Sequence, residues 1–219
     1  MGNLYKKIAL IHAFDDSTAF LKDFNKLAPD GYIKVGPETE SIEAALKIVQ
    51  GIEPSALIVF LGHGYSSGLY CPDVGAFGKR VMVNDVVGNK LFSNHDVVLL
   101  SCNSGEFIKH LNTYRAVIGF GNIISSLEEI SSEAEYSGQF RNVEKDDIDY
   151  FNRSYVEAIM KSINLLINDK ITFKTLPKWI AYFINKQVNY ILRLKHKSNR
   201  MEVAKLFFEF RDEIIYKGF

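Results

Sequence analysis

Residues 57–68 read LIVFLGHGYSSG, and this stretch decides the expected fold. Five apolar residues in a row are typical of a strand that is buried on both faces, as in a parallel sheet covered by helices. Gly62 ends the run and is followed at once by His63 and by a second glycine, Gly64. We therefore expect a central strand that ends at a polar site.

Other short apolar runs surround this one, and helix-like stretches separate them. The predicted strands are KIALIHA (7–13), GYIKVG (31–36), SALIVFLG (55–62), DVVLLSC (96–102) and RAVIGFG (115–121). Helices are predicted over 38–51, where apolar residues recur on one face, and around 84–92 and 104–112. Continuous apolar strands alternating with helices predict an α/β fold, a three-layer sandwich around a mostly parallel sheet.

The composition changes after about residue 122. Residues 128–149 hold eight acidic side chains against two basic ones, and we expect them to form a solvated surface that includes a mobile loop. Three helix-like stretches follow, at 148–167, 177–194 and 200–215. We therefore expect an α/β catalytic core over 1–150 and a helical C-terminal region over 151–219 that packs on the core or extends it.

The bulk composition excludes several classes of function. The 26 Lys and Arg residues equal the 26 Asp and Glu residues, so the total charge argues against a nucleic-acid partner. No apolar run approaches the roughly 20 residues that span a bilayer. Two cysteines are too few for a disulfide framework, and no closely spaced Cys and His set predicts a zinc site. We expect a cytoplasmic protein with free thiols.

His63 and Cys102 stand out because each follows an apolar run closely. In an open parallel sheet, functional groups gather where the carboxyl ends of the strands meet the next loops. Successive strands are commonly neighbours, so the imidazole and the thiol are expected to converge at one edge of the sheet. A thiolate beside a histidine is a nucleophile with its base, and a helix starting after Cys102 would lower the pKa of the thiol.

In this order and spacing the two motifs resemble those of the caspase-like cysteine peptidases, a group that contains caspases, metacaspases, gingipains, separases and CHAT-type domains. The matching residues are LGHG (61–64) and LLSCNSG (99–105). AVIGF (116–120) and the polar loop after it are closest in appearance to CHAT-type domains. The resemblance covers roughly residues 5–165.

The resemblance implies a caspase-like sheet and a cysteine endopeptidase that acts through an acyl-enzyme. His63 would be the general base, Cys102 the nucleophile, and the amides of Gly64 and Cys102 the oxyanion hole. It implies no metal or organic cofactor, a protein substrate, and an activating partner or signal, in bacterial relatives often in defence or cell death. Asp15 and Asp16 match a region that binds substrate in several members, although FDDST also fits an ordinary turn or helix cap. Leu100 occupies the position at which metacaspases commonly carry an acidic residue that helps to bind Arg or Lys of the substrate. One argument for cleavage after a basic residue is therefore lost.

A second hypothesis is that the chain has the same fold but no catalytic activity. Between Lys174 and Arg200 seven basic side chains occur together with Trp179 and several tyrosines. On this interpretation the chain is a catalytically silent interaction module that binds a partner protein through its helical C-terminal region. The reactivity of Cys102 toward an alkylating probe distinguishes the two hypotheses.

Overall fold

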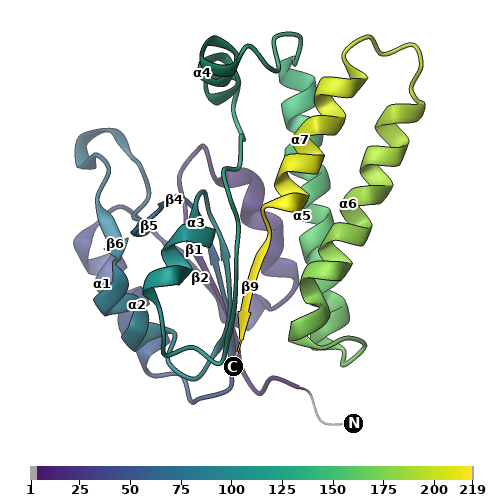
Figure 1. The fold of residues 1–219 in the computed structure, drawn as a ribbon. Coiled ribbons are helices and arrows are strands. Elements are labelled where there is room, and N and C mark those ends of the chain that lie inside the picture. Colours follow the sequence, from purple (N-terminus) through teal and green to yellow (C-terminus); the bar gives the residue numbers. More distant parts are fainter. Residues whose placement is uncertain (1–3, 219) are drawn as a thin grey trace.

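A central sheet of six strands organises the chain. The computed structural model describes residues 4–218, and Figure 1 shows their path. The strand order is β2-β1-β3-β7-β8-β9. Five strands are parallel, namely β1 (Ile8–Ala13), β2 (Tyr32–Val35), β3 (Leu57–Leu61), β7 (Asp96–Leu100) and β8 (Ala116–Gly119), and β9 (Ile215–Gly218) pairs antiparallel with β8. The predicted α/β class with a mostly parallel sheet is confirmed.

The alternation of side chains along β3 explains why the sheet is covered on both faces. Leu57, Val59 and Leu61 belong to one buried cluster, whereas Ile58 and Phe60 belong to another. All five side chains are fully buried. Since successive side chains of a strand point to opposite faces, an unbroken apolar run requires an apolar layer on each side.

The first face of the sheet is covered by helices from the first half of the chain. They are α1 (Thr39–Gln50), α2 (Asp85–Leu91), α3 (Ser104–Phe107) and the short η4 (Ile108–His110). Helix α1 buries Ile42, Ala45 and Val49, at the spacing of one helical face. These residues pack in the same cluster as Phe60.

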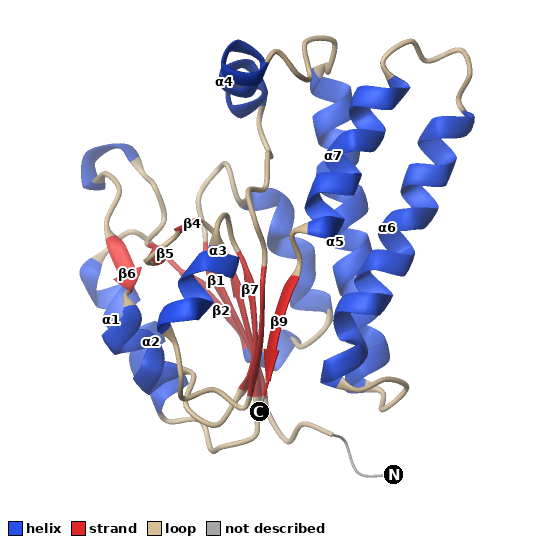
Figure 2. Cartoon of the chain, in the orientation of Figure 1, coloured by secondary structure: helices blue, strands red, loops and turns tan. Residues whose placement is uncertain are grey.

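The second face carries a layer built mainly from the C-terminal helices. Its members are η1 (Ala19–Lys26), α5 (Lys145–Ile167), α6 (Leu176–Arg193) and α7 (Arg200–Asp212). Stacked and edge-on aromatic rings join α5 to α7, with Tyr155 and Phe210 at 4.9 Å between ring centroids. Figure 2 shows the strands between the two helical layers, so the molecule has three layers.

The remaining elements are short, and the sequence predictions missed most of them. A small antiparallel sheet contains β4 (Gly64–Tyr65), β5 (Gly68–Tyr70) and β6 (Val81–Val83). Helix α4 (Leu127–Ser137) stands above the edge of the main sheet in Figure 1, and η2 (Pro29–Gly31), η3 (Gly75–Phe77) and η5 (Phe173–Thr175) are single turns. Among helices of the described chain, none has the length and apolar character to cross a membrane.

The acidic stretch of the sequence is not one mobile loop. Its first part forms α4, and the later acids Asp146 and Asp147 lie in the first turn of α5. Carboxylates are favourable there because the N-terminus of a helix carries partial positive charge. The expected boundary at residue 150 falls inside α5, and β9 returns the C-terminal region to the main sheet.

A buried histidine on β1 gives the fold a pH dependence. His12 accepts a hydrogen bond at Nδ1 from the Tyr32 hydroxyl, 2.6 Å away, and donates from Nε2 to the Thr18 carbonyl, 3.1 Å away. Burial lowers the pKa of His12 from 6.5 to about 4, opposed by the Thr18 carbonyl and Asp15 and reinforced by Lys34. The folded protein therefore keeps this ring neutral at pH values where the unfolded chain binds a proton.

We expect the free energy of unfolding to be constant above about pH 6.5 and to fall by about 3 kcal/mol toward pH 4 through His12. Stability is lost on acidification because only the unfolded state gains the proton in this window. Urea titrations of the wild type and of His12→Gln across the window measure the effect. The same slope in the variant would assign it to other groups, among them His95, whose pKa burial also lowers.

Candidate active site

The two strands that precede His63 and Cys102 are neighbours in the sheet. β3 and β7 pair in parallel, with Leu61 opposite Leu100. Each candidate residue lies two positions beyond its strand, at the same edge. His63 and Cys102 both line one cavity of about 40 Å³. The predicted convergence of the two side chains is therefore present, while their chemical roles stay predictions.

Two glycines allow the chain to turn so close to the neighbouring strand. Gly62 has φ 151° and is followed by His63, which explains how the apolar run ends abruptly. A Cβ on Gly64 would lie 2.6 Å from Ser101 Oγ and 2.8 Å from the Cys102 carbonyl oxygen. The backbone at Gly64 thus packs directly against the turn that carries Cys102, as its proposed part in an oxyanion hole requires.

The turn after β7 is held by a buried serine that the sequence predictions used only as part of a motif. Ser104 Oγ lies 2.7 Å from the Leu99 carbonyl and 2.8 Å from the Ser101 carbonyl, and it accepts a hydrogen bond from the Phe120 amide. Asn103 adopts a left-handed conformation, with φ 54°. Ser104 therefore ties the turn that carries Cys102 to the end of β8.

His63 is oriented by a carboxylate. Its Nε2 lies 3.0 Å from Asp15 Oδ2 and 2.9 Å from Ser17 Oγ. Ser17 Oγ donates to Asp15 Oδ1 at 2.6 Å, so the proton between the imidazole and this pair belongs to Nε2 of the ring. In the neutral ring Nδ1 then has no proton and can accept one.

Asp15 is buried and has donors on both oxygens. Besides His63 and Ser17, the amides of Thr18 and Asp73 donate to the carboxylate, at 3.0 and 2.8 Å. Burial by itself raises the pKa of Asp15, but the hydrogen bonds from His63, Ser17 and the Asp73 amide outweigh it and hold the pKa below its usual value. Asp15 is therefore an anion placed against the imidazole.

Asp16 is exposed and lies beside the same site. Asp15, Asp16 and His63 all line a second cavity, of about 550 Å³, which also contains Asp73, Lys79 and Glu129. The prediction that Asp15 and Asp16 bind substrate is untested by this geometry. What the structure adds is that Asp15 already contacts the candidate base.

The side chain of Cys102 is partly buried in this structure, and its thiol is hydrogen-bonded. Its Sγ donates to the Ile123 carbonyl, 3.4 Å away. Burial raises the pKa of the Cys102 thiol to about 11. The lowering expected from the following helix is absent because α3 has only four residues and burial dominates. The thiol is therefore protonated at neutral pH in this conformation.

Residues 121–126, which lead from β8 to α4, cover part of Cys102. Ile123, Ser125 and Glu129 line the cavity with Cys102, and Asn152 on α5 donates to the Ser125 carbonyl at 2.8 Å. Ser126 caps α4, since its Oγ accepts from the Glu129 amide and the Glu129 carboxylate accepts from the Ser126 amide. A cavity of 40 Å³ holds a water molecule or two but no peptide, so a substrate does not fit beside Cys102 in this conformation.

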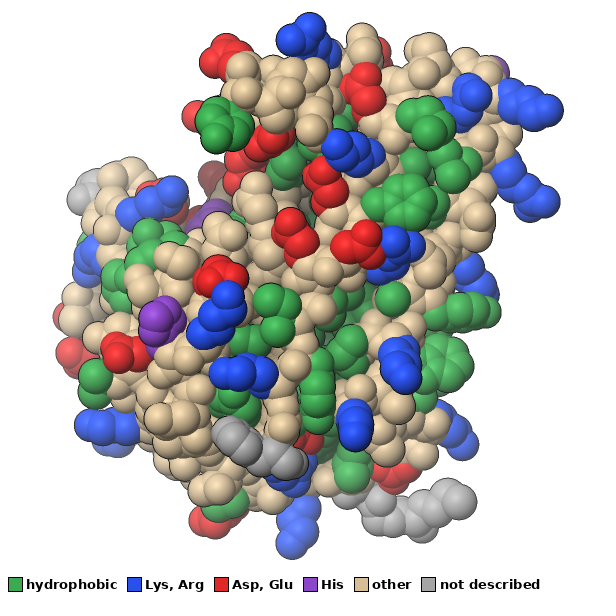
Figure 3. Space-filling view, in the orientation of Figure 1, with side chains coloured by type: hydrophobic (Ala, Val, Ile, Leu, Met, Phe, Trp, Pro, Cys, Tyr) green, Lys and Arg blue, Asp and Glu red, His purple; other side chains and the backbone are tan. Residues whose placement is uncertain are grey.

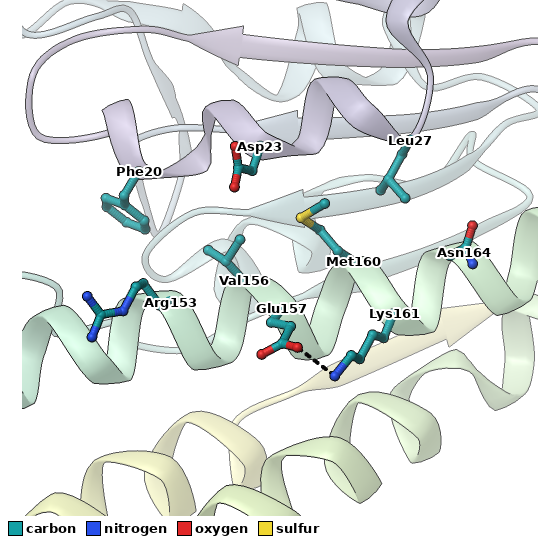
Figure 4. Close-up of a pocket in the computed structure, with 9 residues that line it drawn as sticks. All are labelled: Phe20, Asp23, Leu27, Arg153, Val156, Glu157, Met160, Lys161 and Asn164. Carbon is teal, nitrogen blue, oxygen red and sulfur yellow. Dashed lines mark ion pairs between the residues drawn. The ribbon is translucent and has the colours of Figure 1, made fainter.

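An apolar groove extends from the candidate site along α5. It has a volume of about 460 Å³ between η1 and α5, and Figure 4 shows Val156 and Met160 pointing from α5 toward η1. Phe20 lines both this groove and the cavity that contains Cys102. Glu157 and Lys161 pair with each other on its rim. The groove and the candidate site thus share Phe20 as a lining residue.

Cys71 does not line the cavity that contains His63 and Cys102. Cys71 is buried, and burial raises the pKa of its thiol. Within residues 4–218 no group of three or more His, Cys, Asp and Glu side chains is arranged to hold a metal ion. No protein-family model matches the sequence, and no curated protein matches it.

Proposed function

We propose that the chain is a cysteine endopeptidase of the caspase-like kind, with His63 as general base and Cys102 as nucleophile. One observation carries the proposal. The imidazole and the thiol line the same cavity at the carboxyl ends of adjacent parallel strands, and the buried Asp15 anion contacts the imidazole. Nucleophile, base and orienting group are the three parts that nucleophilic catalysis needs.

The reaction follows from these positions. Nδ1 of neutral His63 takes the proton of the thiol, and the thiolate forms a C–S bond to the scissile carbonyl carbon. The carbonyl electron pair moves to oxygen, where the amides of Gly64 and Cys102 would stabilise it. Collapse breaks the C–N bond, the amine leaves with the proton from His63, and water then hydrolyses the thioester acyl-enzyme. Asp15 stabilises the imidazolium that exists between the two proton transfers.

The conformation described above is the resting state of this enzyme. The raised pKa of the thiol and the small volume of the cavity both oppose reaction, so an activating partner or signal must move residues 121–126. Once open, the site is continuous with the groove beside Phe20, which has the apolar lining to take an apolar side chain of a protein substrate. A cytoplasmic location and a role in defence or regulated cell death remain expectations.

The proposal is tested first on the thiol and then on peptides. Ser126→Ala removes the cap of α4 at a cost of about 1 kcal/mol, so we expect Cys102 to react with iodoacetamide about fivefold faster than in the wild type. Asn84→Ala removes the equivalent cap of α2, where Asn84 Oδ1 accepts from the Val87 amide at 2.9 Å, and should leave the rate unchanged. The Ser126→Ala protein is then incubated with a peptide library, and acyl-enzyme is trapped by acid.

The expected result is cleavage at a restricted set of bonds, with the acyl group found by mass spectrometry on the peptide that contains Cys102. A thiol that becomes accessible without any cleavage or adduct would contradict the peptidase proposal. That outcome would favour the silent interaction module, for which the raised pKa of the thiol and the basic, aromatic surface of α6 are the supporting observations.

A further inference from the structure

Helix α4 has an apolar and acidic surface that the rest of the described chain does not cover. Ile130 is its one buried residue, whereas Leu127 is 40% exposed and Tyr136 is 92% exposed. Both ends of the helix are capped, by Ser126 at the N-terminus and by Gly138 in a left-handed conformation at the C-terminus. A helix of eleven residues is marginal in water by itself, so this one is expected to gain stability from a partner.

The negative charge of α4 indicates the kind of partner surface that it would bind. Residues 127–137 contain four glutamates and no lysine or arginine. Glu129 lines the candidate site and Glu133 lies near Glu209 of α7, so Glu128 and Glu135 are the two on the outer side. They are seven residues apart, which is two helical turns. The partner surface should therefore be basic and partly aromatic, with positive charges two turns apart.

Helix α6 presents such a surface on the same chain. Its inner face packs into the core through Ile180, Ile184, Val188 and Ile191. Its outer face has exposed residues at intervals of three or four, namely Trp179, Tyr182, Lys186, Tyr190 and Arg193, and no acidic residue occurs between 170 and 201. Lys186 Nζ lies 4.7 Å from the centre of the Tyr182 ring. Figure 3 shows basic and apolar side chains along the edge of the molecule where α6 lies.

The two surfaces match in spacing as well as in charge. Lys186 and Arg193 are seven residues apart, as are Glu128 and Glu135. Within one molecule they do not meet, because α4 and α6 lie on either side of α7 in Figures 1 and 2. We propose that the outer face of α4 in one copy docks on the outer face of α6 in a second copy. The contact joins two different surfaces, so it is head-to-tail. It does not depend on peptidase activity.

Sedimentation velocity over a range of protein and salt concentrations tests the contact. The α4 variant carries Glu128→Lys and Glu135→Lys, and the α6 variant carries Lys186→Glu and Arg193→Glu. We expect the wild type to associate with concentration, less so at high salt, and each variant to stay monomeric. A control with Glu40→Lys and Glu43→Lys on the exposed side of α1 changes the net charge as the α4 variant does and should associate like the wild type.

Mixing the α4 variant with the α6 variant tests whether the association occurs between α4 of one copy and α6 of another. The α4 variant keeps an intact α6 and the α6 variant keeps an intact α4, and their two reversed surfaces are complementary as well, so an equimolar mixture should associate as the wild type does although each variant alone stays monomeric. The chain with all four substitutions should associate again, which also shows that none of them prevents folding. A wild type that is monomeric throughout, a mixture that stays monomeric, or an equal loss in the α1 control would each overturn the proposal.

Discussion

Replacing Cys102 with alanine is expected to reduce peptide cleavage by at least about 10⁴-fold, because the proposed acyl-enzyme is a thioester of Cys102. The fold should be unaffected. The thiol makes one weak hydrogen bond, to the Ile123 carbonyl, and the side chain is only partly buried. The measurement compares initial cleavage rates in the Ser126→Ala background, with the thermal unfolding midpoint of each protein recorded beside them.

Cys71 provides the matched control. It is the second free cysteine, and it does not line the cavity that contains His63 and Cys102. Cys71→Ala should cleave at the rate of its parent. Cleavage that survives in Cys102→Ala, or that disappears equally in Cys71→Ala at an unchanged unfolding midpoint, is incompatible with Cys102 as nucleophile.

The main sheet was predictable because its strands are strongly apolar. A run such as LIVFL admits few arrangements other than a strand buried on both faces, and the observed β3 spans the same residues. β9 carries no such signal. Its residues IYKG are short and partly exposed, and they become a strand only because α7 returns the chain to the free edge of β8.

Helix α4 was missed for a different reason. Its eleven residues are dominated by glutamate and serine, so composition indicated a solvated loop. The structure shows a helix because local capping by Ser126 and Glu129 outweighs the weak apolar pattern. Local hydrogen bonds of this kind depend on side-chain directions, which the spacing of apolar residues does not reveal.

The sequence predicts where His63 and Cys102 lie, but not the charged and polar groups that surround them. Strand order and glycine placement bring His63 and Cys102 to one edge, and both can be read from the sequence. The contact between Asp15 and His63 depends on the turn at 14–18, which His12 holds through the Thr18 carbonyl. The partial cover over Cys102 comes from residues 121–126, about twenty positions along the chain. Neither contact leaves a local sequence signal.

Replacing Asp15 with asparagine is expected to lower kcat by about 10² to 10³-fold on every substrate that the enzyme cleaves. The asparagine side chain would keep the volume of the original one but lose the negative charge that stabilises the imidazolium. An amide nitrogen turned toward Nε2 would also favour the tautomer with the proton on Nδ1, which cannot accept one from the thiol. On the proposed mechanism Asp15 is a positioning residue for His63.

This role and the predicted substrate-binding role give different kinetics. If Asp15 orients His63, Asp15→Asn lowers kcat with little change in KM, and the ratio of rates for basic and neutral peptides stays the same. If Asp15 binds a basic substrate residue, the variant raises KM for basic peptides alone. Asp16→Asn is the control, because Asp16 is the next residue in the chain and its side chain is exposed.

The unfolding midpoint separates positioning from a purely structural loss. If Asp15 orients His63, Asp15→Asn lowers kcat while its unfolding midpoint stays close to that of Asp16→Asn. A lower rate accompanied by a reduced unfolding midpoint and a raised KM for all peptides would mean that Asp15 only holds the turn at 14–18 together through Thr18 and Asp73.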